Sequence, residues 1–124
     1  MKRKFMAMVL VLALCLSLCV GASAASDSDS GKIGSTVCTG TLNVDRERGI
    51  ARTSWSGGGS MTAATTINFY YTNSNGQTSV SSDYGTTYAS AGNSLSKGTR
   101  ASSQHRVVSQ TGLGSWSCTL NASV

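Results

Sequence analysis

Residues 115–124 read SWSCTLNASV, and this closing segment decides the fold class of the chain. Its large or apolar side chains occupy alternate positions, and Ser, Thr or Asn occupies every position between them. Such strict alternation is typical of a β-strand with one buried face and one exposed face. A register shift of one residue would expose the whole apolar set. We therefore expect Trp116, Leu120 and Val124 in the core and Ser117 at the surface.

The segment 61–71 alternates in the same way, with Ile67 and Phe69 on one face. Residues 72–76, TNSNG, follow it. The Asn-Gly dipeptide within them adopts the positive φ angles of a tight turn at low cost. The segment 77–82 then returns as the second strand, so the sequence predicts a β-hairpin.

Short segments rich in Val, Ile, Thr and Tyr lie between turn-forming residues in the rest of the chain. They cover residues 33–44, 50–56, 86–91 and 102–110. With the hairpin and the closing segment they make about seven short strands, and no segment after the first 26 residues has the period of an amphipathic helix. The sequence predicts a small all-β fold, an antiparallel β-sandwich that is immunoglobulin-like or barrel-like.

Residues 1–24 have the three parts of a secretory signal peptide. The first four residues, MKRK, form a basic start, and residues 5–20 form an uncharged apolar run. Ala22 and Ala24 then supply the small residues that signal peptidase requires. The apolar run is shorter than the roughly 20 residues of a membrane span. We expect cleavage near Ala24-Ala25, secretion to the extracellular space, and contact with a membrane only through the uncleaved signal peptide.

Residues 25–32 are polar and aperiodic, which predicts a flexible N-terminus before a single β domain over residues 33–124. Asp27 and Asp29 imitate the opening of a calcium-binding loop. Such a loop needs a bidentate acid at its twelfth position, and that position holds Cys38. We therefore expect no metal site.

Two cysteines, Cys38 and Cys118, remain after removal of the signal peptide, which takes Cys15 and Cys19 with it. Because the compartment is oxidising, we expect a disulfide that ties the first predicted strand to the last. The chain-entropy model assigns roughly 4 to 5 kcal/mol to a loop of about 80 residues. Two free buried thiols and an intermolecular bridge remain as alternatives. Neither cysteine has the spacing of a zinc or redox motif.

The formal net charge of +5 overstates the basic character of the exported chain. Ten Lys and Arg residues stand against five Asp and Glu residues, and loss of the three basic residues of the MKRK start leaves +2. That balance is too weak to favour nucleic acid or an anionic membrane as a partner.

Residues with catalytic chemistry are few and poorly spaced. His105 is the only histidine, and we expect it to be a surface or partly buried polar residue rather than a catalytic base. The nucleophile-elbow pattern G-x-S-x-G is missing from the sequence. Paired carboxylates for glycoside hydrolysis would have to come from Asp45, Glu47 and Asp83, of which the first two share one charged turn. We expect no catalytic residue and no cofactor.

Four aromatic residues, Tyr70, Tyr84, Tyr88 and Trp55, form the candidate binding surface. Rings on a β-sheet beside Ser, Thr and Asn stack on sugar faces or fill protein interfaces, although core filling is the alternative for the tryptophan. The sequence favours a secreted, non-enzymatic module that binds a cell-surface protein, a cell-wall glycan or another protein partner. A secreted antimicrobial or toxin-like effector is the second hypothesis, and a small hydrolase is a distant third.

Overall fold

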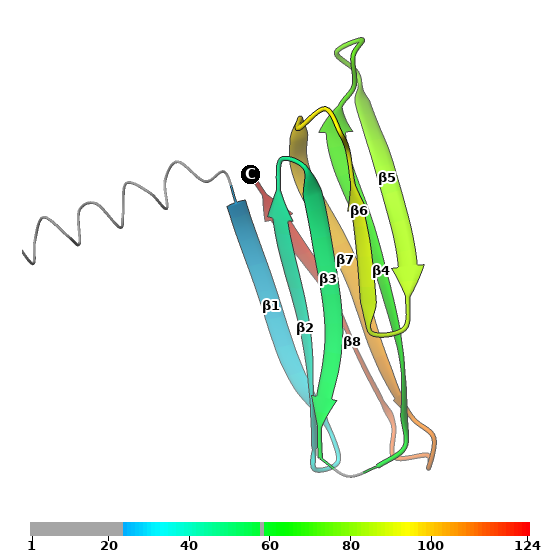
Figure 1. Ribbon diagram of the computed structural model, residues 1–124. Coiled ribbons are helices and arrows are strands. Elements are labelled where there is room, and N and C mark those ends of the chain that lie inside the picture. The colour runs from blue at the N-terminus through cyan, green and yellow to red at the C-terminus, as the bar shows by residue number, and fades with distance from the viewer. Residues whose placement is uncertain (1–23, 58) are drawn as a thin grey trace, which may run out of the picture.

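The computed structural model describes residues 24–57 and 59–124, which form eight antiparallel strands (Figure 1). The strands are β1 (Ala24–Ile33), β2 (Thr36–Asp45), β3 (Arg48–Ser56), β4 (Met61–Thr72), β5 (Thr78–Gly85), β6 (Tyr88–Gly92), β7 (Gly98–Ser109) and β8 (Ser115–Ser123). Apart from Ala24, the predicted signal peptide lies outside the described residues. Within the described ranges, no helix has the length and apolar character needed to cross a membrane.

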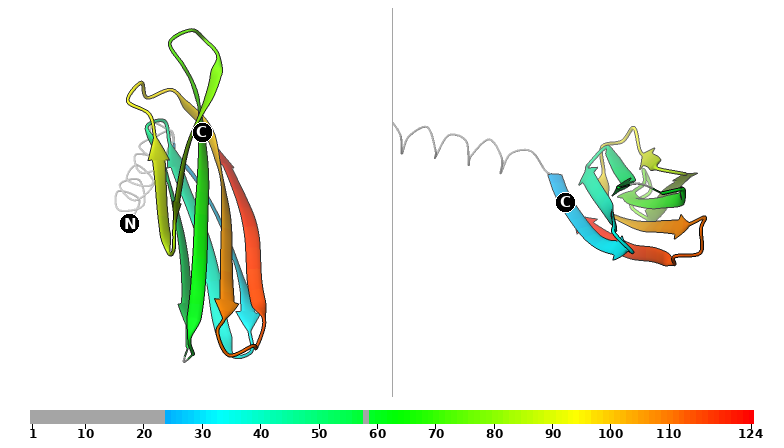
Figure 2. Two further views of the ribbon diagram at one scale, coloured as in Figure 1. Left: turned by 90° about the vertical axis from the view of Figure 1, so that its right-hand side faces the viewer. Right: turned by 90° about the horizontal axis from the view of Figure 1, so that it is seen from below.

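The strands form two four-stranded sheets, ordered β1-β2-β3-β6 and β5-β4-β7-β8. The sheets stack face to face, and β1 and β8 lie beside each other at one side of the stack (Figure 2). The predicted all-β sandwich is therefore confirmed. Eight strands replace the predicted seven because the segment that precedes β2 is itself a strand.

The two segments with the clearest alternation fold as the sequence predicts. In β8, Leu120 and Ala122 are buried, and every Ser, Thr and Asn between the inward positions is exposed. Trp116 and Val124 are half-buried and pack against the core. At the β4–β5 turn, Gly76 has a φ of 77°, and the side-chain oxygen of Asn73 accepts hydrogen bonds from two backbone N–H groups.

The core consists of two apolar clusters with a polar layer between them. The first cluster is built on Leu42, Ile67 and Phe69, and the second on Ile33, Cys38 and Val107. Buried Thr53, Thr65, Ser103 and His105, together with Gly40, occupy the positions between the clusters along β3, β4, β7 and β2. We call these five residues the polar layer.

The predicted flexible N-terminus is a strand. All ten residues of β1 pair with β2, from Ala24 opposite Asp45 to Ile33 opposite Thr36. Its serines face outward, and Asp27 faces the other sheet, where its carboxylate accepts the backbone N–H of Asn121 in β8 at 3.2 Å. An inward-pointing charge at a sheet edge prevents a further strand from pairing there. The polar composition that predicts flexibility therefore also suits an edge strand.

At the opposite side of the sandwich, an aspartate likewise bonds a backbone N–H of the facing edge strand. Asp83 in the edge strand β5 accepts the backbone N–H of Ser90 in the edge strand β6 at 3.0 Å. Each open side thus has one aspartate that bonds the edge of the facing sheet.

The predicted disulfide is not present, because Cys38 and Cys118 are both free thiols. Both side chains face inward as predicted, but they come from different sheets and lie at different heights along the strand direction. A side-chain carbon added at Gly40 would lie 3.0 Å from the Cys118 sulfur, so Cys118 lies opposite Gly40. Cys38 is two residues further along β2, a displacement of roughly 6.6 Å. Alternation predicts the face of each cysteine but not its level across two sheets.

Candidate functional site

The structure does not bring the four predicted aromatic residues together. Tyr88 lies on the outer face of the β1-β2-β3-β6 sheet, opposite Arg52. Tyr70 and Tyr84 lie on the outer face of the other sheet, where Tyr84 is 69% exposed. Trp55 faces inward and packs against the second apolar cluster. This placement agrees with core filling, the alternative for this residue.

The outer face of the β1-β2-β3-β6 sheet is organised by strand register into rows of side chains. One row contains Ser28, Thr41, Arg52 and Tyr88, and the next contains Ser26, Asn43, Ile50 and Ser90. Arg48 and Gly92 follow as neighbours in the row after that. Hydroxyl and amide groups thus surround one apolar side chain, Ile50.

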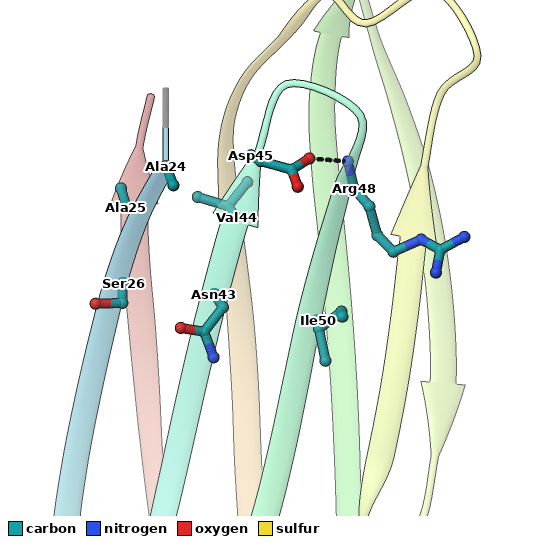
Figure 3. Close-up of a pocket in the computed structure, with 8 residues that line it drawn as sticks. All are labelled: Ala24, Ala25, Ser26, Asn43, Val44, Asp45, Arg48 and Ile50. Carbon is teal, nitrogen blue, oxygen red and sulfur yellow. Dashed lines mark hydrogen bonds between the residues drawn. The ribbon is translucent and has the colours of Figure 1, made fainter. Parts of the chain in front are cut away.

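Three adjacent hollows open on these rows, and Ile50 lines all three. Figure 3 shows the first of them, with Ser26, Asn43 and Ile50 contributed by neighbouring strands. The second continues past Arg48 to Ser90 and Gly92. Their volumes of about 360, 770 and 590 Å³ fall within the range of small-molecule sites. Because they are shallow and continuous, they form an open trough across the four strands, which we call the Ile50 trough.

The charged groups of the Ile50 trough differ in whether they already form hydrogen bonds within the protein. The Asp45 carboxylate accepts the backbone N–H groups of Glu47 and Arg48 at 2.7 and 2.8 Å, so it holds the β2–β3 turn (Figure 3). The Glu47 carboxylate accepts the Ser96 hydroxyl. The guanidinium of Arg52 lies over the Tyr88 ring, 5.4 Å from its centroid, and both side chains are exposed. The trough therefore offers its guanidinium groups to a ligand, while hydrogen bonds within the protein already engage its carboxylates.

His105 lies at the centre of the polar layer and is 1% exposed. Its Nε2 lies 2.7 Å from the Ser103 hydroxyl, and its Nδ1 lies 2.8 Å from the Thr53 hydroxyl. The Thr53 hydroxyl lies 2.7 Å from that of Thr65, which donates to the Thr86 carbonyl at 2.7 Å. The expectation of a surface or partly buried histidine is therefore wrong, because hydroxyls from two strands, Thr53 of β3 and Ser103 of β7, satisfy the ring inside the core.

The direction of this chain of hydrogen bonds determines which ring nitrogen of His105 must carry a proton. The Thr86 carbonyl only accepts, so Thr65 donates to it and must accept from Thr53. Thr53 has then used its one proton, so Nδ1 of His105 carries a proton and donates to Thr53. The neutral ring, in which Nε2 accepts from the Ser103 hydroxyl, is the form that burial favours. Burial lowers the pKa of His105 below its ordinary value, and a hydrogen bond to the Arg52 backbone, which favours the charged ring, opposes that shift only in part.

The two cysteines are the other buried residues whose side chains could act as nucleophiles. Burial, with Asp29 and Asp27 nearby, raises the pKa of the Cys118 thiol to about 11, and burial also raises the pKa of Cys38. The reactive thiolate is therefore disfavoured at both positions. Asp83 accepts the Ser90 N–H at the β5–β6 side of the sandwich, whereas Asp45 holds the β2–β3 turn. Among the residues that the structure describes, no three His, Cys, Asp or Glu side chains converge on a metal site.

Comparison of the chain with models of known families, with curated proteins and with solved structures finds no match. The trough around Ile50 is the feature that the sequence pattern did not predict. The sequence feature that could have indicated the trough is the pairing of Arg52 with Tyr88, and this pairing can be recognised only when the β3–β6 register is known.

Proposed function

We propose that this chain is a secreted, non-enzymatic β-sandwich module that binds a cell-surface or cell-wall glycan in the Ile50 trough. The observation that carries the proposal is the set of three hollows that share Ile50 and cross all four strands of one sheet. An open trough of this kind suits an extended chain better than a compact small molecule, because both of its ends are free.

The composition of the trough favours a glycan. Ser26, Ser28, Thr41 and Asn43 provide hydroxyl and amide groups on one side. Sugar hydroxyls exchange hydrogen bonds with such groups, and the C–H face of a sugar ring packs on an apolar floor, here Ile50. The Arg52–Tyr88 pair at one edge adds a stacked guanidinium that donates to a carboxylate or phosphate substituent.

A binding role fits the chemistry better than catalysis. A general base must reach the proton that it removes, and His105 is enclosed by hydroxyl-bearing residues of the core. The proposal that the module is secreted is supported only by the signal-peptide pattern of residues 1–24.

The test uses the exported chain, residues 25–124, with isolated bacterial cell walls and an immobilised glycan panel. We expect saturable binding that falls at least about tenfold in the double variant Ile50→Ser/Asn43→Ala, since several hydrogen bonds and the apolar floor are lost together. Val37→Ser/Thr39→Ala is the matched control, because these residues lie on the same outer face of β2 but outside the three hollows. Equal binding by both double variants would contradict the proposed site. Growth inhibition of neighbouring bacteria without any glycan binding would instead favour the effector hypothesis.

A further inference from the structure

The outer face of the β5-β4-β7-β8 sheet repeats the arrangement of arginine on tyrosine found in the Ile50 trough. Arg100 lies opposite Tyr70 in the β7–β4 register, and its guanidinium is 3.9 Å from the centroid of the tyrosine ring. Arg52 lies opposite Tyr88 in the β3–β6 register, with the corresponding distance at 5.4 Å. Each pair lies on the outer face of its own sheet, and the two sheets stack face to face (Figure 2), so the pairs are on opposite faces of the sandwich.

Stacking on a tyrosine ring prepares a guanidinium for an anion. The ring covers one face of the group and restricts its rotation, while the N–H groups along the edge remain available. These N–H groups match a carboxylate or phosphate in a bidentate geometry. Arg100 is itself exposed, so its free edge is open to solvent.

The charge of this second face is all of one sign. Its outward positions follow from the register of the four strands, and the charged residues among them are Arg100 and Arg106. All other outward residues of these four strands are uncharged, and most of them are Thr, Ser, Asn or Gln. Asp83 of β5 points to the opposite side, where it bonds Ser90. The face therefore complements an anion rather than a cation.

The spacing of the two arginines indicates the length of the ligand. Arg100 and Arg106 are six residues apart on β7, which places them roughly 20 Å apart along the strand. A hollow of about 490 Å³ beside Arg106 is lined by Thr66, Gln104, Ser117 and Thr119 among others. A single small anion cannot reach both guanidinium groups, whereas a chain with repeated anionic groups can.

We infer that the outer face of the β5-β4-β7-β8 sheet is a second binding site, for a glycan chain that carries carboxylate or phosphate groups. This inference rests on the proposed function and extends it: with one site on each face, the protein bridges two polymer chains. Bridging requires opposed sites, and the two arginine–tyrosine pairs supply them.

The experiment measures cross-linking as well as binding. The exported chain is mixed with polygalacturonate, which carries carboxylates, with poly(glycerol phosphate), which carries phosphates, and with neutral dextran. Turbidity is followed across a range of protein-to-polymer ratios, and affinity and stoichiometry are measured by calorimetry. We expect turbidity to pass through a maximum with at least one anionic polymer and to stay at baseline with dextran; the polymer that responds identifies the anionic group.

Two double variants with the same change in charge separate the faces. Arg100→Gln/Arg106→Gln alters the second face, and Arg48→Gln/Arg52→Gln alters the Ile50 trough. We expect each to abolish the turbidity and to halve the number of polymer sites bound per protein, while thermal melting stays unchanged. Arg100→Lys should weaken binding at the second face by about tenfold despite the retained charge, because an ammonium cannot donate in the same bidentate plane.

The possible failures are distinguishable. Wild-type turbidity and stoichiometry in Arg100→Gln/Arg106→Gln would overturn the second site and leave the Ile50 trough intact. Unchanged turbidity and stoichiometry in Arg48→Gln/Arg52→Gln, with complete loss in the other variant, would overturn the bridging, while the proposed function of the trough is decided separately by glycan binding of Ile50→Ser/Asn43→Ala. Turbidity without any polymer would show that a second copy of the chain occupies the face and would also overturn the inference.

Discussion

The first apolar cluster and the polar layer are equally buried, yet they hold the two sheets together by different means. Phe69 in the cluster and His105 in the layer are both almost inaccessible to solvent. The cluster gains stability from apolar area removed from water. The layer gains little from area, and it is tolerated because no buried side-chain nitrogen or oxygen among the described residues lacks a hydrogen-bond partner. The cluster should therefore respond to changes of volume, and the layer to changes of hydrogen bonding and proton occupancy.

The largest expected effect is on the cluster. Phe69→Ala should lower the free energy of unfolding by roughly 3 to 5 kcal/mol, because it removes a large buried side chain and leaves a cavity. Denaturant melts of residues 25–124 measure the loss. Tyr84→Ala is the control for removal of a ring: Tyr84 is 69% exposed, and its loss should cost about 0.5 kcal/mol or less. Equal effects of the two substitutions would mean that the faces of β4 and β5 are misassigned.

A smaller effect is expected in the polar layer when its volume is kept. Thr53→Val replaces the hydroxyl with a methyl group of similar size, so no large cavity forms. The N–H at Nδ1 of His105 then loses its acceptor, and the Thr65 hydroxyl loses its donor. The expected cost is about 1 to 3 kcal/mol in the same melts. Thr41→Val, on the outer face of β2, is the matched control and should change stability by less than about 0.5 kcal/mol. A neutral Thr53→Val would show that the hydroxyl is dispensable and that the layer behaves like the cluster.

The next effect is the pH dependence of stability that protonation of His105 causes. Because burial lowers the pKa of folded His105, the unfolded chain takes up a proton first as the pH falls. Stability is therefore full above the unfolded value of about 6.5 and decreases as the pH falls from there toward the lower folded pKa. One group contributes a slope of at most about 1.4 kcal/mol per pH unit. Urea melts between pH 7.5 and 5 measure it.

The control for the pH effect is His105→Gln, which retains polar atoms but does not titrate. This variant will be less stable at every pH, and its stability should lose the part of the pH dependence that belongs to the imidazole. The same slope below pH 6.5 in both proteins would assign the dependence to the carboxylates and contradict the buried neutral histidine.

The same contrast explains how much of the fold the sequence could predict. Alternation and turn chemistry are local signals, so residues 115–124 and the hairpin around Asn75-Gly76 were correctly predicted. The burial of His105 was not, because its two hydroxyl partners come from β3 and β7, and one of them is held in turn by Thr65 of β4. A period-two pattern assigns a residue to a face, and only the packing of two sheets determines what that face meets.

In the candidate sites, too, the sequence indicates single residues but not the partners that they meet in the fold. Tyr70 and Tyr88 could be named from the sequence as candidate binding residues, but their arginine partners are separated from them by 30 and 36 positions in the chain. Ser and Asp in residues 25–32 predict flexibility when they are considered alone. Their role as an edge strand appears only when Asp27 meets the exposed N–H of Asn121.

The smallest expected effect is that of a reducing agent, and it tests whether the polar layer and the second cluster are separate levels of the core. Cys118 lies opposite Gly40 in the layer, whereas Cys38 belongs to the cluster below it. If this offset is correct, the thiols are free, and dithiothreitol should leave the melting temperature of the exported chain unchanged. A disulfide between them would close a loop of about 80 residues, and its reduction would cost roughly 4 to 5 kcal/mol. Alkylation in denaturant followed by mass measurement should likewise add two labels without prior reduction. A large loss of stability in dithiothreitol, with no labels before reduction, would place the two sulfurs at one level and remove the distinction between layer and cluster on the β2–β8 side of the sandwich.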